Sequence, residues 1–523
     1  MTDDGFFADE TDFAAIGIKS PVLLQRIKDL GFTRPTSVQA ALFGELSSGV
    51  GSITVGAETG SGKTLAYLAP LIDDILQRKA AAAAQADSNK DPGYDYARAI
   101  ILVPNKELVQ QVVRMAMPLA GGKQALVYGG KSLSDPSFQA KAVPETTVPD
   151  HEVVRLAILP GGLYEPLDFP PFRNSFGLGG SDAPCDLVIA TPANVGPLGL
   201  KPKHIDMFAD IQTLIIDEAD MLLDGGYLRQ LENVLMGFRR ADRLQVNESL
   251  GVKKTQHVFV AATLPDMGLR SVDAYLENRF PDASKITMAG MHNARHYGLS
   301  EQTVWVEEDS KKARMEQLVE LLQQSVEQGG LQGEKVMVFL NSVDDVEGAS
   351  QALNRAGMNS LPYHAKVKIG ERTETLDRFR QYDRNTPDAD GTVPILVCTD
   401  LASRGLDVPG VNTVVQLQFA GNVVAHLHRM GRCGRAGKQT GRGIVFYDEK
   451  ERELIEVVRE AEDQQERMVL KGDVMELDQE ESSAGKVQKA FSRKRGFTKK
   501  RKKIRRDERE ETESSYTGGN EPY

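Results

Sequence analysis

One glycine-rich run carries most of the information about this chain's architecture: Ala57-Glu58-Thr59-Gly60-Ser61-Gly62-Lys63-Thr64. The apolar segment Ile53–Val55 precedes it, and the helix-like run Leu65–Leu76 follows it. A glycine-rich loop between a strand and a helix lets backbone N–H groups converge on phosphate oxygens. In such a loop Lys63 reaches the β- and γ-phosphates, and the Thr64 hydroxyl ligates Mg²⁺. A flexible glycine turn is the alternative, but the strand–loop–helix context and the Lys-Thr pair argue against it.

A second chemical signal is a group of carboxylates at the end of another apolar run. Leu214–Ile216 leads directly into Asp217-Glu218-Ala219-Asp220. The carboxyl ends of parallel strands are where α/β proteins bind ligands. There, Asp217 can hold Mg²⁺, and Glu218 can orient and deprotonate an attacking water. Alone, this run would more often be an acidic surface turn. Together with the phosphate loop, it predicts a hydrolytic site rather than a surface turn.

Short continuous runs of Val, Ile and Leu recur along the chain and alternate with longer helix-like segments. Such runs, bounded by turn residues, are typical of strands buried on both faces of a parallel α/β sheet. With 523 residues the chain exceeds one ordinary core, so two domains are expected. The predicted strands are Ile53–Val55, Ala99–Val103, Leu187–Ala190, Thr213–Ile216, Val258–Ala261, Val336–Leu340, Ile395–Cys398, Thr413–Leu417 and Gly443–Phe446.

The series of predicted strands pauses around Ala289–Ser300, where Gly, Asn and Ser cluster. We place the domain linker there, and expect a first domain over residues 1–290 and a second over residues 301–450. Two segments are expected to be surface loops: Ala80–Tyr96, and the Pro- and Gly-rich insertion Lys131–Ser181.

Residues 451–523 change character along their length. Glu451–Met468 has helical periodicity, and Lys486–Arg506 is strongly basic. We therefore expect a helical extension followed by a basic, largely disordered tail. Its most basic part, Phe491–Arg506, is predicted to tether RNA, with a nuclear or nucleolar address as the alternative.

Composition and charge restrict the class of protein. A net charge of −11 argues against binding nucleic acid through bulk charge, but leaves room for a locally basic groove. The three cysteines, Cys185, Cys398 and Cys433, lack a disulfide-like or zinc-like spacing, which fits a reducing, intracellular compartment. No apolar run is long enough to span a membrane, and the acidic N-terminus is unlike a leader peptide.

The chain resembles the DEAD-box RNA helicases, a family named for the residues that stand here as Asp217-Glu218-Ala219-Asp220. The match runs from about Phe13 to Phe446, with the motifs in the family's order. The resemblance implies two tandem RecA-like α/β domains, each a parallel sheet flanked by helices. It also implies an RNA-stimulated ATPase that uses ATP and Mg²⁺, and that contacts RNA through phosphate and sugar rather than through base sequence.

The resemblance extends the predicted ATP site beyond the phosphate loop. Gly31–Gln39 is similar to the family's adenine-reading Q motif, and His428–Arg435 is similar to motif VI. An arginine supplied across a cleft stabilises the phosphoryl transition state only when the lobes close. The implied catalytic residues are Lys63, Asp217, Glu218, Arg432 and Arg435, with Thr64 and Asp217 on the metal. The implied ATP-binding residues are Phe13, Gln39, Ala57, Thr59, Gly60, Ser61, Gly62, Lys63, Thr64 and Asp407.

Two further sets of residues follow from the same resemblance. The implied RNA-binding residues are Pro104, Lys106, Gly129, Gly130, Thr191, Asn341, Thr399 and Arg404. The residues implied to couple hydrolysis to unwinding are Asp220, Thr263 and His428.

The chain departs from the family pattern mainly on the RNA side. Asn105-Lys106 stands where Thr-Arg is usual, so the charge remains but the bidentate fork of arginine is lost. Ala193-Asn194 replaces Gly-Arg, and Ala261 replaces the serine of the coupling motif. Ala365, Ile369 and Gln418 replace glycine, glutamine and aspartate. The sequence therefore predicts ATPase activity more firmly than strong unwinding.

Two other functions remain open from the sequence. An ATP-gated RNA clamp or scaffold with weak unwinding fits the altered coupling motif. A DNA translocase or another P-loop phosphotransferase fits the phosphate loop, but the Q motif and motif VI argue against both. The basic tail suggests ribosome assembly as the pathway; the sequence does not identify protein partners.

Overall fold

The structure is a computed structural model of the 523-residue chain. It describes residues 7–49, 51–57, 60–84, 98–128, 149–159, 185–202, 205–224, 227–247, 255–261, 270–287, 299–306, 310–327, 335–382, 395–402, 408, 410–420, 423–433, 441–449, 451–452 and 455–456.

An eight-stranded sheet forms the centre of the first lobe, and every pairing between its strands is parallel. The strands are apolar on both sides, because helices cover both faces. In spatial order they are β3 (Leu126–Tyr128), β4 (Leu156–Leu159), β5 (Leu187–Ala190), β2 (Ala99–Leu102), β6 (Thr213–Asp217), β7 (Gln256–Ala261), β1 (Ser52–Gly56) and β8 (Ser284–Thr287).

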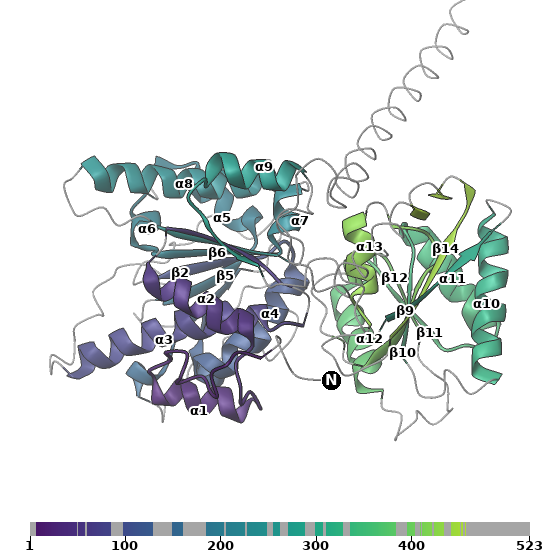
Figure 1. Cartoon of the computed structure of the whole chain (residues 1–523), viewed down its shortest axis with the longest axis horizontal. Coiled ribbons are helices and arrows are strands. Elements are labelled where there is room, and N and C mark those ends of the chain that lie inside the picture. Colours follow the sequence, from purple (N-terminus) through teal and green to yellow (C-terminus); the bar gives the residue numbers. More distant parts are fainter. Residues whose placement is uncertain are drawn as a thin grey trace, which may run out of the picture.

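Two layers of helices enclose this sheet (Figure 1). One face carries α1 (Pro21–Asp29), α2 (Ser37–Ser48), α3 (Lys63–Ala84) and α4 (Lys106–Ala120). The other carries α5 (Pro192–Gly199), α6 (Ile205–Asp210), α7 (Ala219–Asp224), α8 (Leu228–Asn247) and α9 (Arg270–Arg279). Two short 3-10 turns, Gly122–Ala125 and Asp150–Glu152, complete the lobe.

A six-stranded parallel sheet forms the centre of the second lobe. Its helices again cover both faces, α12 and α13 on one and α10 and α11 on the other. The strands in order are β11 (Ser360–Tyr363), β12 (Ile395–Cys398), β10 (Lys335–Phe339), β13 (Val411–Gln416), β14 (Gly441–Tyr447) and β9 (Leu299–Trp305). The helices are α10 (Lys311–Glu327), α11 (Val343–Arg355), α12 (Ile369–Gln381) and α13 (Val423–Met430), with a 3-10 turn at Asp400–Ala402.

All nine predicted strands are confirmed, but the two predicted surface loops are partly regular. Helix α3 continues through the alanine run to Ala84, because alanine has the highest helix propensity. Strand β4 lies inside the predicted insertion, between β3 and β5, and its four residues are buried. Long Pro- and Gly-rich flanks concealed this short apolar run. Residues 85–96 of the first predicted loop, residues 131–148 and 160–181 of the insertion, and the tail from residue 457 lie outside the described residues.

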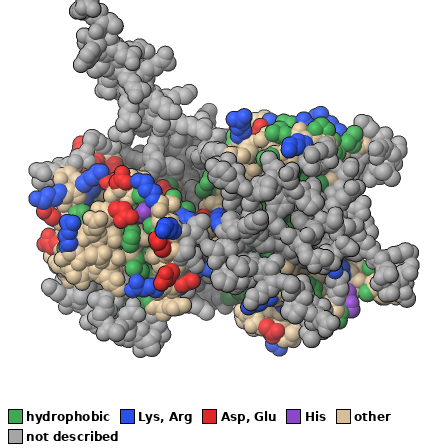
Figure 2. All heavy atoms as spheres, turned by 180° about the vertical axis from the view of Figure 1, so that it is seen from behind, with side chains coloured by type: hydrophobic (Ala, Val, Ile, Leu, Met, Phe, Trp, Pro, Cys, Tyr) green, Lys and Arg blue, Asp and Glu red, His purple; other side chains and the backbone are tan. Residues whose placement is uncertain are grey.

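The two lobes lie side by side, with α7 and α4 of the first nearest to α12 and α13 of the second (Figure 1). An ion pair joins Glu107 to Arg372 across this interface, and His428 Nε2 lies 3.4 Å from Asp220 Oδ2. Seen from behind, the described surface of the second lobe carries interspersed acidic and basic side chains (Figure 2). None of the helices in the described part of the chain combines the length and apolar composition that a membrane span requires.

Candidate active site

The phosphate loop connects the carboxyl end of β1 to the first residue of α3, as the sequence predicts. Gly60 and Gly62 have φ of 92° and 85°, values in the left-handed region that favour glycine. Lys63 begins the helix, and its Nζ lies 2.6 Å from the carbonyl oxygen of Ala57. The ammonium group is therefore folded over the loop, within reach of a phosphate bound at the helix N-terminus.

The Q motif packs directly against the phosphate loop. Thr36 and Gln39 form a capping box that starts α2, with Gln39 Oε1 accepting the Thr36 N–H at 2.9 Å. The Thr36 hydroxyl donates to the Ser61 carbonyl at 2.9 Å, and Gln39 Nε2 donates to the Gly62 carbonyl at 3.2 Å. A Cβ at Gly62 would collide with the Gln39 amide, so glycine permits this approach. Phe13, predicted for the adenine site, is 3% exposed and packs in the core beneath.

The acidic motif lies at the carboxyl end of β6, and its three carboxylates, Asp217, Glu218 and Asp220, are buried. Asp217 Oδ1 accepts the Glu218 N–H at 2.9 Å, and Oδ2 accepts the Tyr67 hydroxyl at 2.8 Å. Among the described residues other than glycine, only Glu218 has a positive φ, of 51°. Such strain costs roughly 1–3 kcal/mol and is typical of functional positions.

Burial is the largest cause of the pKa shifts of these groups. It raises the pKa of Asp217 and of Glu218, and the neighbouring carboxylates raise that of Glu218 further. Burial also lowers the pKa of Lys63, although Glu218, Asp217 and Asp220 act in the opposite direction. A carboxylate with a raised pKa is better suited to take a proton from water.

The second lobe brings basic groups to this centre. His428 lies in the last turn of α13 and Arg432 follows the helix, and both are buried. His428 Nε2 lies 3.4 Å from Asp220 Oδ2, with the two side chains 4% and 3% exposed. Arg432 acts on the pKa of Lys63, so its positive charge lies near the phosphate loop. The structure thus brings together predicted residues from both lobes.

Those predicted RNA-binding residues that the structure describes lie at the carboxyl ends of neighbouring strands. Pro104 and Lys106 follow β2, Thr191 follows β5, Asn341 follows β10 and Thr399 follows β12. The buried Thr191 hydroxyl has no hydrogen-bond partner among the described residues. The Asn341 side chain makes its hydrogen bonds within the second lobe: it donates to the Phe419 carbonyl and accepts from Arg429. Seven predicted site residues lie outside the described residues: Thr59, Gly129, Gly130, Thr263, Arg404, Asp407 and Arg435.

Three of the residues that depart from the family pattern have hydrogen-bond partners within the fold. Asn105 caps α4 by accepting the Leu108 N–H at 2.9 Å, and Asn194 Nδ2 donates to the Leu159 carbonyl at 3.0 Å. Gln418 accepts the Asn341 N–H at 2.8 Å and donates to Asp345 at 3.0 Å. These amides stabilise local structure where the family places charged or hydroxyl groups.

Sequence reasoning missed two buried side chains beside the site. Tyr67 bonds Asp217, and its spacing one helical turn beyond Lys63 was the available signal. Arg429 is fully buried, and it contacts Asp400 at 2.6 Å and Asn341 at 2.7 Å. Its signal was its position inside motif VI.

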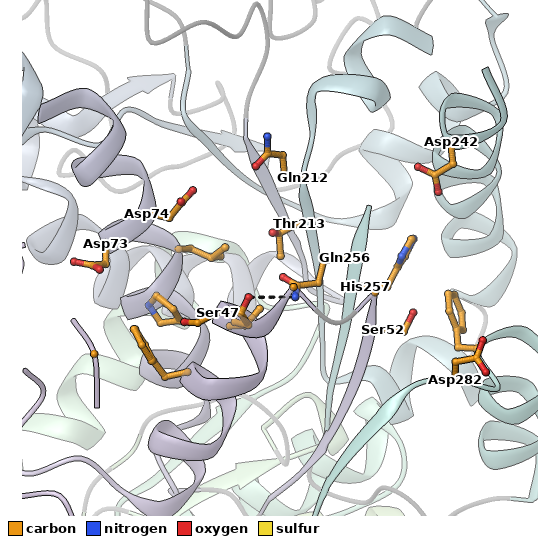
Figure 3. Close-up of a pocket in the computed structure, with 18 of the residues that line it drawn as sticks. Ser47, Ser52, Asp73, Asp74, Gln212, Thr213, Asp242, Gln256, His257 and Asp282 are labelled. Atoms are coloured by element: carbon orange, nitrogen blue, oxygen red, sulfur yellow. Dashed lines mark hydrogen bonds between the residues drawn. The ribbon is translucent and has the colours of Figure 1, made fainter. Parts of the chain in front are cut away.

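A cavity of about 1120 Å³ opens at the other end of the first sheet. Ser52, Thr213 and Gln256, which begin β1, β6 and β7, lie along its floor, with Asp73 and Asp74 of α3 at one side (Figure 3). The phosphate loop and the acidic motif are at the carboxyl ends of the same strands. The cavity is therefore separate from the site that the motifs form.

Two family models match the chain. The DEAD/DEAH box helicase model matches residues 36–154 and 174–271, and the helicase conserved C-terminal domain model matches residues 313–437. The chain belongs to the DEAD-box RNA helicases. This helicase is accordingly an ATP-dependent, RNA-binding enzyme whose ATPase is stimulated by RNA.

Relatives match the helicase over most of its length. It is 29% identical to DEAD-box ATP-dependent RNA helicase 22 of Oryza sativa subsp. japonica, over 95% of this chain and 85% of the relative. It is 27% identical to the protein of that name from Arabidopsis thaliana, over 98% of this chain and 87% of the relative.

Solved structures of other helicases share the fold. The structure of Mss116p bound to ssRNA and AMP-PNP matches with a TM-score of 0.63 and 19% identity, over 87% of this chain and 78% of that chain. S. cerevisiae Dbp5 bound to RNA and ADP BeF3 matches with a TM-score of 0.56 and 18% identity, over 88% and 99%. The predicted fold of two RecA-like α/β domains is confirmed.

Proposed function

We propose that the helicase hydrolyses ATP at a centre shared by its two lobes. Lys63 binds the β- and γ-phosphates, Asp217 holds the metal, and Glu218 takes a proton from the attacking water. Arg432 and Arg435 stabilise the transition state from the second lobe. The observation that carries this proposal is the contact between the lobes at this centre, where His428 Nε2 lies 3.4 Å from Asp220 Oδ2 beside the phosphate loop.

The residues present fit Mg²⁺ as the metal. Asp217 and Thr64 supply one carboxylate and one hydroxyl, which are hard oxygen donors, and both contact the same tyrosine hydroxyl. Mg²⁺ typically takes one or two carboxylates and completes its shell with waters and substrate phosphates. When bound, the ion supplies charge neutralisation for the phosphate oxygens. Asp217 is oriented for this task because each of its oxygens already accepts a hydrogen bond.

The nucleotide and RNA sites communicate through lobe closure in this proposal. Gln39 hydrogen-bonds the adenine edge, and its side-chain amide also donates to the Gly62 carbonyl of the phosphate loop. Asp220 and His428 couple the two lobes, because their contact exists only when the lobes meet. Each ligand that favours closure then tightens the binding of the other.

The RNA surface is proposed to run along the carboxyl ends of β2 and β5 and to continue onto β10 and β12. The buried Thr191 hydroxyl, which lacks a hydrogen-bond partner among the described residues, supports contact with an RNA phosphate or sugar there. Lys106 adds a point charge in place of a bidentate arginine.

An ATP-gated clamp with weak unwinding is the second candidate function. Two observations favour it. The Asn194 side-chain amide donates a hydrogen bond to the Leu159 carbonyl, and Ala261 has no hydroxyl at the coupling motif. An ATPase assay and a strand-displacement assay on one RNA duplex separate the two functions. The clamp would hydrolyse ATP and hold RNA without releasing the displaced strand.

A glutamine at position 218 tests the catalytic assignment. Glu218→Gln should abolish hydrolysis while ATP and RNA still bind, because the amide fills the space but takes no proton. Lys63→Ala should instead weaken ATP binding itself. Near-normal turnover by Glu218→Gln would remove Glu218 from the role of base.

For the RNA substrate and the pathway, we propose structured RNA and ribosome assembly. The basic segment Phe491–Arg506 supports the proposal of ribosome assembly, because a cationic segment can bind structured RNA through its phosphates. Crosslinking the protein to its RNAs in cells, followed by sequencing, tests this directly. Recovery of ribosomal RNA precursors would support ribosome assembly, and recovery of other RNAs alone would exclude it.

A further inference from the structure

Tyr67 links the phosphate loop to the acidic motif. It lies on the first turns of α3, three residues after Thr64, so both side chains leave the same face of the helix. Its ring is fully buried in the first lobe's core, but its hydroxyl donates to Asp217 Oδ2 at 2.8 Å. This bond joins α3 to the end of β6 across 150 residues of sequence.

Thr64 contacts the same phenol oxygen. The Thr64 side chain hydrogen-bonds Tyr67, and the single Tyr67 hydroxyl proton is already given to Asp217. Thr64 must therefore be the donor in its own bond. The resulting chain runs from the Thr64 hydroxyl through the Tyr67 hydroxyl to the Asp217 carboxylate.

This chain connects the two side chains that receive Mg²⁺ in the proposed function. The other Asp217 oxygen accepts the Glu218 N–H at 2.9 Å, so both oxygens of the carboxylate are held. Partners that orient a metal ligand from the outer shell commonly affect metal affinity or activity 10- to 100-fold, as an order of magnitude. We propose that Tyr67 is a positioning residue that orients Asp217 and Thr64 to receive Mg²⁺ together with ATP.

A buried tyrosine that merely satisfies its hydroxyl is the competing explanation, because buried phenols usually find a partner. The two explanations differ in what removal of the oxygen changes. Tyr67→Phe keeps the ring and its packing in the core, and deletes only the link between Thr64 and Asp217. If Tyr67 orients the metal ligands, Tyr67→Phe should bind the metal more weakly. If Tyr67 has only a structural role, the variant should lose stability and keep its metal affinity.

The inference rests on the proposed function, so the wild type is measured first. Mn²⁺ replaces Mg²⁺ as a paramagnetic probe, and its binding to the full chain with a non-hydrolysable ATP analogue is followed by electron paramagnetic resonance. Tyr67→Phe should weaken Mn²⁺ binding by about tenfold. The Mg²⁺ concentration for half-maximal ATPase should rise by the same factor, while the rate at saturating Mg²⁺ changes little.

Tyr275→Phe is the matched control, because it removes a tyrosine–carboxylate bond in the same lobe, from Tyr275 to Glu232 at 3.2 Å. It should leave Mn²⁺ affinity unchanged. Replacing Tyr67 by 4-aminophenylalanine, which restores a donor at the same place, should recover most of the affinity even if Tyr67→Phe folds poorly.

Two results would overturn the inference, and they differ. If the wild type binds Mn²⁺ with nucleotide and Tyr67→Phe binds it equally well, Tyr67 is structural and the proposed function stands. If the wild type shows no nucleotide-dependent Mn²⁺ binding, the proposed function fails and the role of Tyr67 fails with it.

Discussion

Arg372 of the second lobe forms an ion pair with Glu107 of the first, with Nη2 2.8 Å from Oε1. The two side chains are only 10% and 19% exposed, so the pair is largely shielded from solvent. Glu107 lies on the first turn of α4, next to Lys106 of the predicted RNA surface. The pair exists only while the lobes are together, and it therefore favours the closed state.

Removing one partner of this pair should weaken closure, because a partly buried charge is left without compensation. Glu107→Gln should weaken binding of single-stranded RNA about tenfold when a non-hydrolysable ATP analogue is present, which corresponds to about 1.4 kcal/mol. RNA binding without nucleotide should change little. Fluorescence anisotropy of a labelled RNA, with and without the analogue, measures both.

Two further variants test the assignment to closure. Arg378→Gln changes an exposed arginine on the same helix and should have no effect. The double variant Glu107→Arg with Arg372→Glu should recover part of the lost affinity. Equal losses with and without nucleotide would mean that Glu107 acts on RNA directly.

Local patterns predicted the strands and the phosphate and acidic motifs, because each is a continuous stretch with its own chemistry. They did not predict the pairing of Glu107 with Arg372, since two surface-like charges separated by much of the chain carry no pairing signal. Tyr67 was hidden for a related reason: its ring fits an apolar helix pattern, and only the fold brings Asp217 to its hydroxyl. Gln418 departs from the family's aspartate, and the sequence alone did not predict that its side chain would hydrogen-bond both Asn341 and Asp345.

The coupling motif offers a test of unwinding strength. Ala261 ends β7, is fully buried, and its carbonyl accepts the Ala57 N–H of the phosphate loop at 3.1 Å. Ala261→Ser would restore the hydroxyl that the family has there, and should increase duplex opening per ATP hydrolysed. Strand displacement and ATPase rate are measured together. Ala190→Ser, at the buried end of β5, is the control; an unchanged ratio in Ala261→Ser would show that the departure is neutral.

Arg429 should be a major source of stability for the second lobe. It is fully buried, contacts Asp400 and Asn341, and lies 5.4 Å from the Phe339 ring centroid. Lysine cannot meet these partners together, so Arg429→Lys should cost about 3 kcal/mol. Trp305 is the only tryptophan and lies on β9, so its fluorescence during urea unfolding reports on this lobe. Arg442→Lys, on β14, should cost far less, and similar losses in both variants would contradict the special role of Arg429.

His426 should make the second lobe sensitive to mild acid. Burial lowers the pKa of its imidazole to about 3, and the Arg429 charge acts in the same direction. Gln416 Oε1 faces Arg429, so Gln416 Nε2 donates to His426 Nδ1 at 2.8 Å and the ring accepts while neutral. The unfolded chain binds a proton at this histidine below about pH 6.5, whereas the folded lobe does not until about pH 3. Stability is therefore lost as the pH falls below about 6.5, at roughly 1.4 kcal/mol per pH unit.

The variant His426→Asn removes this titration and keeps an acceptor for Gln416. Its stability deficit relative to the wild type should shrink by about 1.4 kcal/mol between pH 7.5 and about pH 5.5, one unit below the unfolded value. Urea unfolding followed by Trp305 fluorescence at the two pH values measures the difference. His151→Asn, in the first lobe, should leave this transition unchanged. A deficit that stays constant with pH would mean that the folded lobe accepts the proton, and that the His426 ring is not held neutral.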